Sequence, residues 1–564
     1  MVSTNSSPRS TSPASLASSI PIIDLFAGPG GLGEGFSSIL GSDGQPYFDL
    51  RLSVEKDPVA HQTLELRSFF RKFPRGDVPD DYYLFLQGKI DRATLYSRHA
   101  AQADAARHEA WNMELGSAQV KETELDDRIV RSVDGNPLWM LIGGPPCQAY
   151  SLAGRSRNKG IQGYRPEEDH RHFLYREYLR ILAKHWPPVF VMENVKGILS
   201  STVGGSPIFE QILQDLQDPS VACPQYGRSQ YGGYRIYSLV KPATDFDIYG
   251  SPSHEPRDFI IEAEKYGIPQ ARHRVILLGV RRDIPEDPGI LSPRQKPVSA
   301  SQVLAGLPQL RSGLSKKPDS DDEWLRAVRK IATADLLEEI GAMGGVLVQK
   351  QVEQTVRRLS VSKFGRGNEF LEWTDTLQYE RDWFIDPRLR GVCNSATRGH
   401  MVSDLHRYIY AACFAKVHSR SPRLADFPSL LHPEHKNVDR SMGHGNFSDR
   451  FRVQLEEQPS TTVVSHIAKD GHYYIHYDPK QCRSLTVREA ARLQTFPDNY
   501  FFCGNRTEQY SQVGNAVPPL LSRQIAEVLR ALLERVRARK SDGQDRSRAT
   551  KLEYVEDQEY GHRA

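Results

Sequence analysis

Short apolar runs recur along the chain and alternate with amphipathic stretches. Runs of about four to eight apolar residues, bounded by glycine, proline or polar residues, are typical of strands that are covered on both faces. Such runs occupy residues 20–26, 138–142, 188–192, 234–240 and 274–280. Apolar side chains at helical spacing predict helices over residues 32–40, 172–185, 484–494 and 520–536. This alternation predicts an α/β fold built on a mostly parallel sheet.

Two long stretches interrupt the alternation. Residues 69–135 are polar and charged, and we expect a solvated insert without chemistry of its own. Its predicted helices cover residues 82–86, 100–106 and 109–115. From residue 301 to residue 480 no regular alternation of strands and helices is visible, which indicates a second, smaller and irregular domain.

These patterns divide the chain into two domains and two tails. The first domain covers residues 20–300, the second covers 301–480, and residues 481–537 return to the first. Residues 1–19 are rich in Ser, Thr and Pro, whereas residues 538–564 are charged and poor in apolar side chains. Such compositions do not bury enough apolar surface to fold, so both ends are predicted to be disordered tails.

Composition adds few constraints. The net charge of +3 is uninformative, because a basic cleft can lie within a balanced total. The six cysteines include no CxxC pair, which fits a reducing compartment, and no apolar run is long enough to cross a membrane. Residues 1–19 lack the apolar core of a signal peptide, so a cytoplasmic protein is expected. Cys393, His400, His406 and Cys413 lack the compact spacing of metal ligands, so no metal site is expected.

A glycine-rich turn follows the first predicted strand. Gly28, Gly30 and Gly33 satisfy G-x-G-x-x-G, a spacing that lets the backbone turn sharply and approach a ligand closely. Glu55 follows about twenty residues later, where an acid can hydrogen-bond the two ribose hydroxyls of a nucleoside. These residues indicate a nucleotide-like cofactor. A nicotinamide-dependent dehydrogenase fits them as well, and so does a purely structural glycine turn.

A cysteine stands at the carboxyl end of the strand predicted over residues 138–142. It is Cys147, and Gly144, Pro145 and Pro146 before it stop both helix and strand. Open α/β sheets place reactive groups at this edge, and a thiolate is a strong nucleophile. Cys147 is therefore a candidate nucleophile, although a lone cysteine is more often a buried and inert side chain.

Charged residues near other strand ends complete the candidate site. Glu193 follows the strand over 188–192 and would either cap the next turn or offer a carboxyl group to a ring nitrogen. Arg272 and Arg274 are two positions apart where another strand begins, so their side chains point to the same face. Such a pair can bind a phosphate or an oriented carboxylate. The other interpretation is that the two arginines are ordinary surface residues. The basic stretch over 152–167 would either close over a phosphate backbone or be a mobile surface loop.

Six stretches resemble the motifs of the cytosine-5 DNA methyltransferases. They are DLFAG at 24–28, GPPCQ at 144–148, ENV at 193–195, QARHR at 270–274, REAARLQ at 488–494 and GNAVP at 514–518. Each motif is weak alone, but together they follow the family's usual, unpermuted order. The resemblance covers residues 20–285 and 483–536, and the stretch between them matches the position of the family's target-recognition domain.

The resemblance implies a Rossmann-like, S-adenosylmethionine-dependent methyltransferase sheet with a smaller, irregular target-recognition domain. It implies that Cys147 adds to carbon 6 of cytosine, so that carbon 5 can attack the methyl group of the cofactor. Glu193 would hydrogen-bond ring nitrogen 3 and the amino group, while Arg274, with Arg272, would orient the base and hold Glu193. Loss of the proton from carbon 5 would release Cys147. The target base must leave the duplex stack, so base flipping is implied.

The resemblance also implies a cofactor pocket for S-adenosyl-L-methionine. Its residues would be Phe26, Gly28, Gly30, Leu32, Glu55, Pro146, Asn515 and Val517, with the ribose on Glu55. The family has an acid that meets the adenine amino group, and Asp77 is the candidate here, with a solvated surface acid as the other interpretation. The insert between Asp77 and Cys147 is longer than the minimal family pattern.

The implied function is sequence-specific methylation of double-stranded DNA by a monomeric cytoplasmic enzyme. A bacterial restriction–modification setting would add a cognate restriction endonuclease as a functional partner. Two other enzymes remain as alternatives: an RNA cytosine-5 methyltransferase on the same fold, and a dehydrogenase that would leave Cys147 and Glu193 unused. A non-catalytic DNA-binding relative is disfavoured because Cys147, Glu193 and Arg274 are all present. No code maps the side chains of a recognition domain to bases, so the recognised sequence is not predicted.

Overall fold

The computed structural model describes residues 19–117, 121–146, 171–203, 206–248, 250–315, 318–361, 363–433 and 449–560. Cys147, the basic stretch over 152–167 and the predicted N-terminal tail, except Ser19, lie outside these ranges. Within them, no helix is both long enough and apolar enough to cross a membrane.

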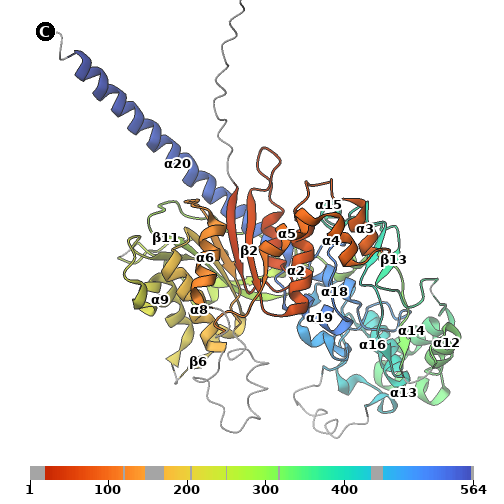
Figure 1. Cartoon of the computed structure of the whole chain (residues 1–564). Coiled ribbons are helices and arrows are strands. Elements are labelled where there is room, and N and C mark those ends of the chain that lie inside the picture. The colour runs from red at the N-terminus through yellow and green to blue at the C-terminus, as the bar shows by residue number, and fades with distance from the viewer. Residues whose placement is uncertain are drawn as a thin grey trace, which may run out of the picture.

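A mixed sheet forms the centre of the first domain (Figure 1). Its strand order is β3-β2-β1-β4-β5-β11-β8, and β9 also pairs with β11. The strands are β1 (Ile20–Leu25), β2 (Phe48–Glu55), β3 (Ala110–Asn112), β4 (Met140–Gly143), β5 (Val189–Val195), β8 (Tyr234–Tyr237), β9 (Ile260–Glu262) and β11 (His273–Arg281). Neighbours from β3 to β5 are parallel, whereas β11 runs antiparallel to β5, β8 and β9. The predicted α/β fold is therefore confirmed, with a mixed sheet that is parallel from β3 to β5 and antiparallel around β11.

Alternate side chains of the strands enter two apolar cores. In β1, Ile20 and Ile22 belong to one core, whereas Ile23 and Leu25 belong to the other. The first core is closed by α1 (Gly31–Ser37) and α20 (Pro519–Tyr560), and the second by α6 (Glu122–Val133), α8 (Arg171–His185) and α9 (Ile208–Gln217). Both faces are covered, which is why the strands are near-continuous apolar runs.

The insert is a packed helical unit, not the solvated excursion that its polarity predicts. Its helices are α3 (Asp80–Leu86), α4 (Arg92–Arg98) and α5 (Ala100–Glu109), which share an apolar core with α2 (Pro58–Arg71). The helix predicted over 109–115 is wrong, because Ala110–Asn112 pair with the last residues of β2 as the edge strand β3. The main-chain partners that β2 offers override the weak helical propensity of so short a segment.

The second domain is largely helical, which corrects the prediction of an irregular domain. Its described helices include α12 (Asp321–Arg329), α13 (Ala334–Gly344), α14 (Val346–Arg357) and α16 (Val402–His418). All of these helices contribute to one core, which includes Trp324, Val352 and Tyr408. Most of them span only two or three turns, so their amphipathic spacing gives a weak signal in the sequence.

Among the last segments, α20 packs into the first apolar core of the sheet. The helix predicted over 484–494 is α18 (Val487–Leu493), and Thr486 and Glu489 cap it reciprocally. After α19 (Arg506–Asn515), helix α20 continues to Tyr560, so the tail predicted from residue 538 is helical up to that residue. Residues 538–560 contain no proline and many good helix formers, and Figure 1 shows α20 projecting from the molecule.

Candidate active site

A cavity of about 710 Å³ lies at the carboxyl ends of the parallel strands β1, β2, β4 and β5. Most of the residues predicted for the site line it, namely Phe26, Gly28, Leu32, Glu55, Pro146, Glu193, Arg272, Arg274, Asn515 and Val517. Gly30 and Asp77 are not part of its wall, and Cys147 lies outside the described residues. Pro146 immediately precedes Cys147. The structure thus brings Glu193, Arg272 and Arg274 together with most of the residues predicted for the cofactor site.

The turn between β1 and α1 is built from residues with left-handed backbone angles. Phe26, Gly28 and Gly30 have φ angles of 59°, 58° and 98°. A side chain at Gly30 would lie 2.9 Å from the hydroxyl of Tyr500, so this glycine permits a close contact behind the cavity wall. Glu55 accepts the N–H groups of Gly28 at 2.8 Å and Asp57 at 2.7 Å. Burial raises the pKa of Glu55, and these two hydrogen bonds oppose that shift.

Glu193 and Arg274 form an ion pair on the cavity wall. Arg274 Nε donates to Glu193 Oε1 at 2.9 Å, and the two side chains are only 13% and 15% exposed. The antiparallel pairing of β5 and β11 fixes this geometry. Arg274 lies opposite Val195, whose side chain is on the same face of β5 as that of Glu193. Burial lowers the pKa of Arg274, and Glu193 counteracts that shift. A Cβ atom on Gly144 would lie 2.9 Å from Glu193 Oε2, so the segment leading to Cys147 passes directly against this carboxylate.

Arg272 holds main-chain groups rather than Glu193. Its buried guanidinium donates to the carbonyl oxygen of Val463 at 2.8 Å and to that of Gly514 at 3.4 Å. Its Nε has no hydrogen-bond partner among the described residues. A side chain at Gly514 would collide with the main chain of Ser465, which explains the glycine of the last motif. Arg272 therefore joins the end of the second domain to the C-terminal motif at the cavity.

Asp24 is a cavity residue that the sequence reasoning did not single out. It is 1% exposed, and neither of its carboxylate oxygens has a hydrogen-bond partner in the described part of the chain. Burial raises the pKa of Asp24 well above its usual value. The available signal was an acid inside an apolar strand, because a buried carboxyl group is costly unless a ligand or partner compensates it.

Glu114, not Asp77, reaches the cavity beside β2. Asp77 is exposed in the turn that precedes α3. Glu114 follows β3 on the cavity wall, where it lies 3.3 Å from the Lys56 ammonium group. Because residues 109–115 were predicted to form a helix, Glu114 was not predicted to lie at the end of a strand. A strand followed by an acid was the signal that could have revealed it.

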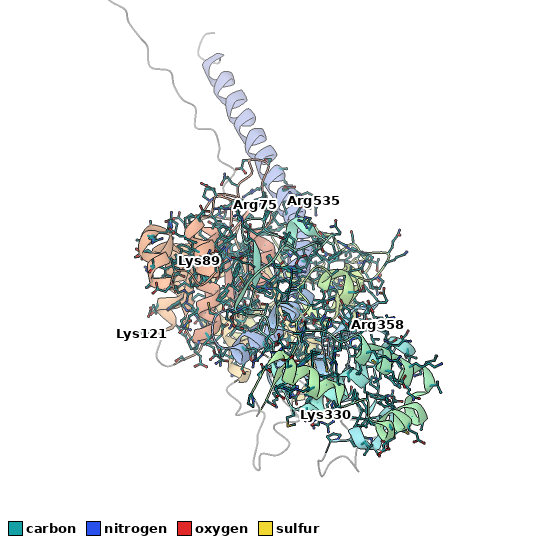
Figure 2. The ribbon with its side chains drawn as sticks, turned by 90° about the vertical axis from the view of Figure 1, so that its right-hand side faces the viewer. Arg75, Lys89, Lys121, Lys330, Arg358 and Arg535 are labelled. Atoms are coloured by element: carbon teal, nitrogen blue, oxygen red, sulfur yellow. The ribbon has the colours of Figure 1, made fainter. Side chains whose placement is uncertain are left out.

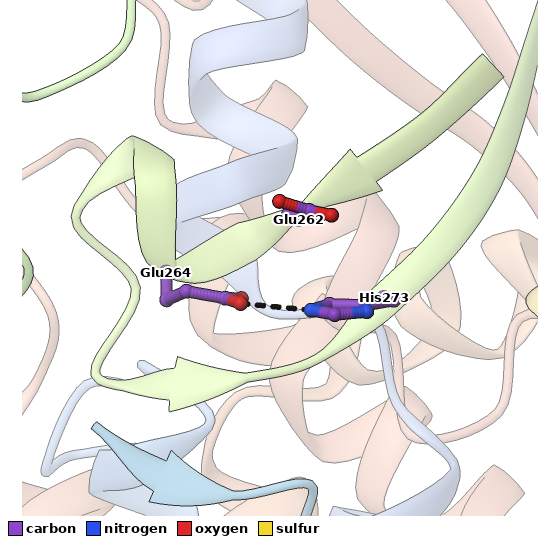
Figure 3. Close-up of side chains that lie close together, drawn as sticks. All are labelled: Glu262, Glu264 and His273. Carbon is purple, nitrogen blue, oxygen red and sulfur yellow. Dashed lines mark hydrogen bonds and ion pairs between the residues drawn. The ribbon is translucent and has the colours of Figure 1, made fainter. Parts of the chain in front are cut away.

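The described residues contain one cluster with the geometry of a metal site, formed by Glu262, Glu264 and His273. Figure 3 shows Glu264 hydrogen-bonded to His273, at 2.7 Å, with Glu262 beside them. Glu262 is itself paired with Lys265 at 2.5 Å. These groups already satisfy one another, and the pair anchors the start of β11 next to Arg272 and Arg274. A metal role for this cluster is therefore not assigned.

Comparison with known proteins places the chain in a family. A model of the C-5 cytosine-specific DNA methylases matches residues 100–220 and 258–531. The type II methyltransferase M.Bpa9945I of Bacillus paralicheniformis is 31% identical over 534 residues, which cover 91% of this chain and 99% of the relative.

Two further relatives have the same kind of name. The type II methyltransferase M.DdeI of Desulfomicrobium norvegicum is 24% identical, with 90% of this chain and 87% of the relative covered. The DNA (cytosine-5-)-methyltransferase M.ApeKI of Aeropyrum pernix is 25% identical, with 70% and 82% covered.

The sheet and its cavity thus define a methyltransferase of the Rossmann-like class, as the resemblance predicted. The chain belongs to the C-5 cytosine-specific DNA methylase family. It is a DNA (cytosine-5-)-methyltransferase with bacterial type II relatives, and the dehydrogenase alternative is set aside.

Proposed function

We propose that this enzyme methylates carbon 5 of a cytosine within a short sequence of double-stranded DNA, and that the flipped base binds beside Glu193. The observation that carries this proposal is the buried ion pair between Glu193 and Arg274 on the cavity wall. A carboxyl group held in this way can accept a hydrogen bond from the cytosine amino group and share a proton with ring nitrogen 3. Charge that develops on the ring is thereby stabilised.

Cys147 is the proposed nucleophile. Its sulfur would form a bond to carbon 6, the ring electrons would move toward carbon 5, and carbon 5 would take the methyl group as the bond from that group to the sulfonium sulfur breaks, which would leave the sulfur as a neutral thioether. A base then removes the proton from carbon 5, the bond between sulfur and carbon 6 breaks, and the thiolate leaves. Support comes from the neighbours of Cys147, because Pro146 lines the cavity and Gly144 packs against Glu193.

The cavity wall fits S-adenosyl-L-methionine, which supplies an electrophilic methyl group when bound. Asp24, a buried carboxyl group without a partner in the described chain, suits the ammonium group of the cofactor. Glu55, fixed by two N–H groups, suits the ribose hydroxyls, and Glu114 suits the adenine amino group. Phe26, Leu32, Pro146, Asn515 and Val517 would enclose the rest of the cofactor.

The second domain is the proposed reader of the DNA sequence. Its last segment reaches the cavity, since Val464 and Ser465 line the cavity and Arg272 donates to the carbonyl oxygen of Val463. The names of M.Bpa9945I and M.DdeI describe type II methyltransferases, so we propose a role in modification opposite a cognate restriction endonuclease. The monomer predicted from the sequence stays a prediction.

Replacement of the nucleophile tests this proposal. Cys147→Ser should abolish transfer of labelled methyl groups to unmethylated genomic DNA, while binding of S-adenosylmethionine persists. Cys223→Ser is the matched control, because Cys223 lies after α9, away from the cavity wall. Normal turnover by Cys147→Ser would remove Cys147 from the mechanism.

A further inference from the structure

A second polar cavity, of about 360 Å³, adjoins the active-site cavity. The two cavities share Thr507, at the start of α19. The short helix η8 (Ser465–Ala468) separates them, because Ser465 lines the active-site cavity whereas Ala468 and Lys469 line the second one. Figure 1 shows α19 between the sheet and α16 of the second domain. The second cavity therefore lies where the two domains meet, beside the active-site cavity.

Three cationic side chains from separate segments line this second cavity. They are Arg398, Lys469 and Arg506. Arg398 donates to the carbonyl oxygens of Ile467 at 2.8 Å and Lys469 at 2.5 Å, so its guanidinium is fixed in place. Arg506 donates to the carbonyl oxygen of Thr397 at 2.7 Å. Among the described residues, no carboxylate forms an ion pair with any of the three cations.

The acids and histidines of the cavity do not neutralise this charge. Asp404 is paired with Arg407 at 2.9 Å, and Asp470 lies 3.6 Å from Arg450. Burial, together with Arg398 and other cations nearby, lowers the pKa of His400, and burial also lowers the pKa of His472. Burial and the repulsion of Arg398 also lower the pKa of Arg506. The cavity is thus a concave, partly buried site with an excess of positive charge, which favours an anion.

We propose that this second cavity binds a backbone phosphate of the DNA next to the flipped nucleotide. A phosphodiester offers the anionic oxygens that guanidinium and ammonium groups bind, and such contacts fix the register of a protein on a duplex. Arg398 and Arg506 supply donors that are held by main-chain carbonyl groups, and the exposed Lys469, directly after η8, binds the same phosphate. Ser465 of η8 also lines the active-site cavity. Binding of the phosphate next to η8 is therefore coupled to the position of the target base in that cavity. The inference rests on DNA as the substrate, and not on the roles proposed for Cys147 and Glu193.

Equilibrium binding of duplex DNA, without cofactor, tests this inference. Lys469→Gln and Arg506→Gln should each weaken binding by up to about eightfold at roughly 0.1 M salt, and each should lower the slope of log K against log salt by up to about 0.9, the value for one neutralised phosphate. Arg75→Gln is the matched control, since it removes one exposed charge at the end of the molecule from which α20 projects (Figure 2). This control should leave both the affinity and the slope unchanged.

Two further readouts make the result decisive. Thermal unfolding and S-adenosylmethionine binding should be unchanged in Lys469→Gln, whose side chain is exposed, so a loss of DNA affinity in this variant reports the contact itself. Salt slopes equal to that of Arg75→Gln in both variants would overturn the inference. So would weaker cofactor binding at an unchanged DNA slope, because the anion would then be the cofactor carboxylate. Methyl transfer is not measured in this test, so its failure is separate from failure of the proposed mechanism.

Discussion

Glu193 is the residue on which the proposed chemistry depends most. In the folded chain its carboxylate is held by Arg274 and lies against Gly144. We expect Glu193→Gln to lower the rate of methyl transfer about 100-fold, because a positioned proton donor contributes about 10²- to 10⁴-fold. Single-turnover transfer of labelled methyl groups measures this loss. The exposed Glu210→Gln on α9 is the control, and an unchanged rate in Glu193→Gln would reassign Glu193 to a structural role.

We expect Asp24 to couple the stability of the protein to cofactor binding. Burial raises the pKa of this carboxyl group, so its contribution to folding is present below the unfolded pKa and is lost as the pH rises through the folded pKa. At neutral pH, Asp24→Asn should therefore raise the melting temperature of the cofactor-free protein. The same change should weaken S-adenosylmethionine binding about tenfold or more, since a charged hydrogen bond is worth about 1.5–3 kcal/mol. Calorimetric titration checks the affinity, and unchanged affinity would exclude Asp24 from the ammonium site.

The sequence predicted most of the site at this scale because each motif residue stands next to a strand end. Glu193, Arg274 and Glu55 were found in this way, and all three line the cavity. Asp24 and Glu114 were not found, for different physical reasons. Asp24 lies inside a strand, and the apolar run around it predicts only the strand and no role for the acid. Glu114 follows a three-residue strand whose pairing with β2 depends on tertiary structure.

At the scale of elements, the glycine turn is fixed by its contacts with the C-terminal motif. A side chain at Gly31 would collide with the carbonyl oxygen of Val517, and would also crowd Phe496. Gly31→Ala should therefore destabilise the protein by about 1–3 kcal/mol, the usual cost of overpacking, and weaken cofactor binding. Urea unfolding measures the first effect. Gly289→Ala is the control, because its nearest neighbour would lie 3.9 Å away, and equal stability of the two variants would contradict this account.

Helices and strands were predictable where the apolar pattern is long. The predictions failed where tertiary contacts determine the secondary structure. The strands β1, β4, β5 and β11 and the helix α8 follow from their apolar spacing. The insert was misjudged because its helices bury aromatic side chains such as Tyr82 while remaining polar on average. The second domain was misjudged in the same way, since each short helix contributes only a few residues to the shared core.

In the whole molecule, the sheet with its cavity and the second domain meet along one boundary. The sheet carries the cavity, the second domain packs beside it, and Arg272 joins Val463 and Gly514 across the boundary. The order of the motifs predicted this arrangement, because the first and last motifs had to meet in one cofactor site. The boundary itself, with the second cavity between η8 and α19, was not predictable. It depends on how segments that lie far apart in the sequence, between Ser315 and Thr507, pack together.

The most direct test is to incubate the purified protein with S-adenosylmethionine and unmethylated genomic DNA, and then to map 5-methylcytosine by conversion sequencing. Our account predicts methylation confined to one short sequence motif, with no methylation by Cys147→Ser. Protein that binds the cofactor yet leaves every cytosine of the DNA unmodified would contradict the account. In that case RNA would be the next substrate to test.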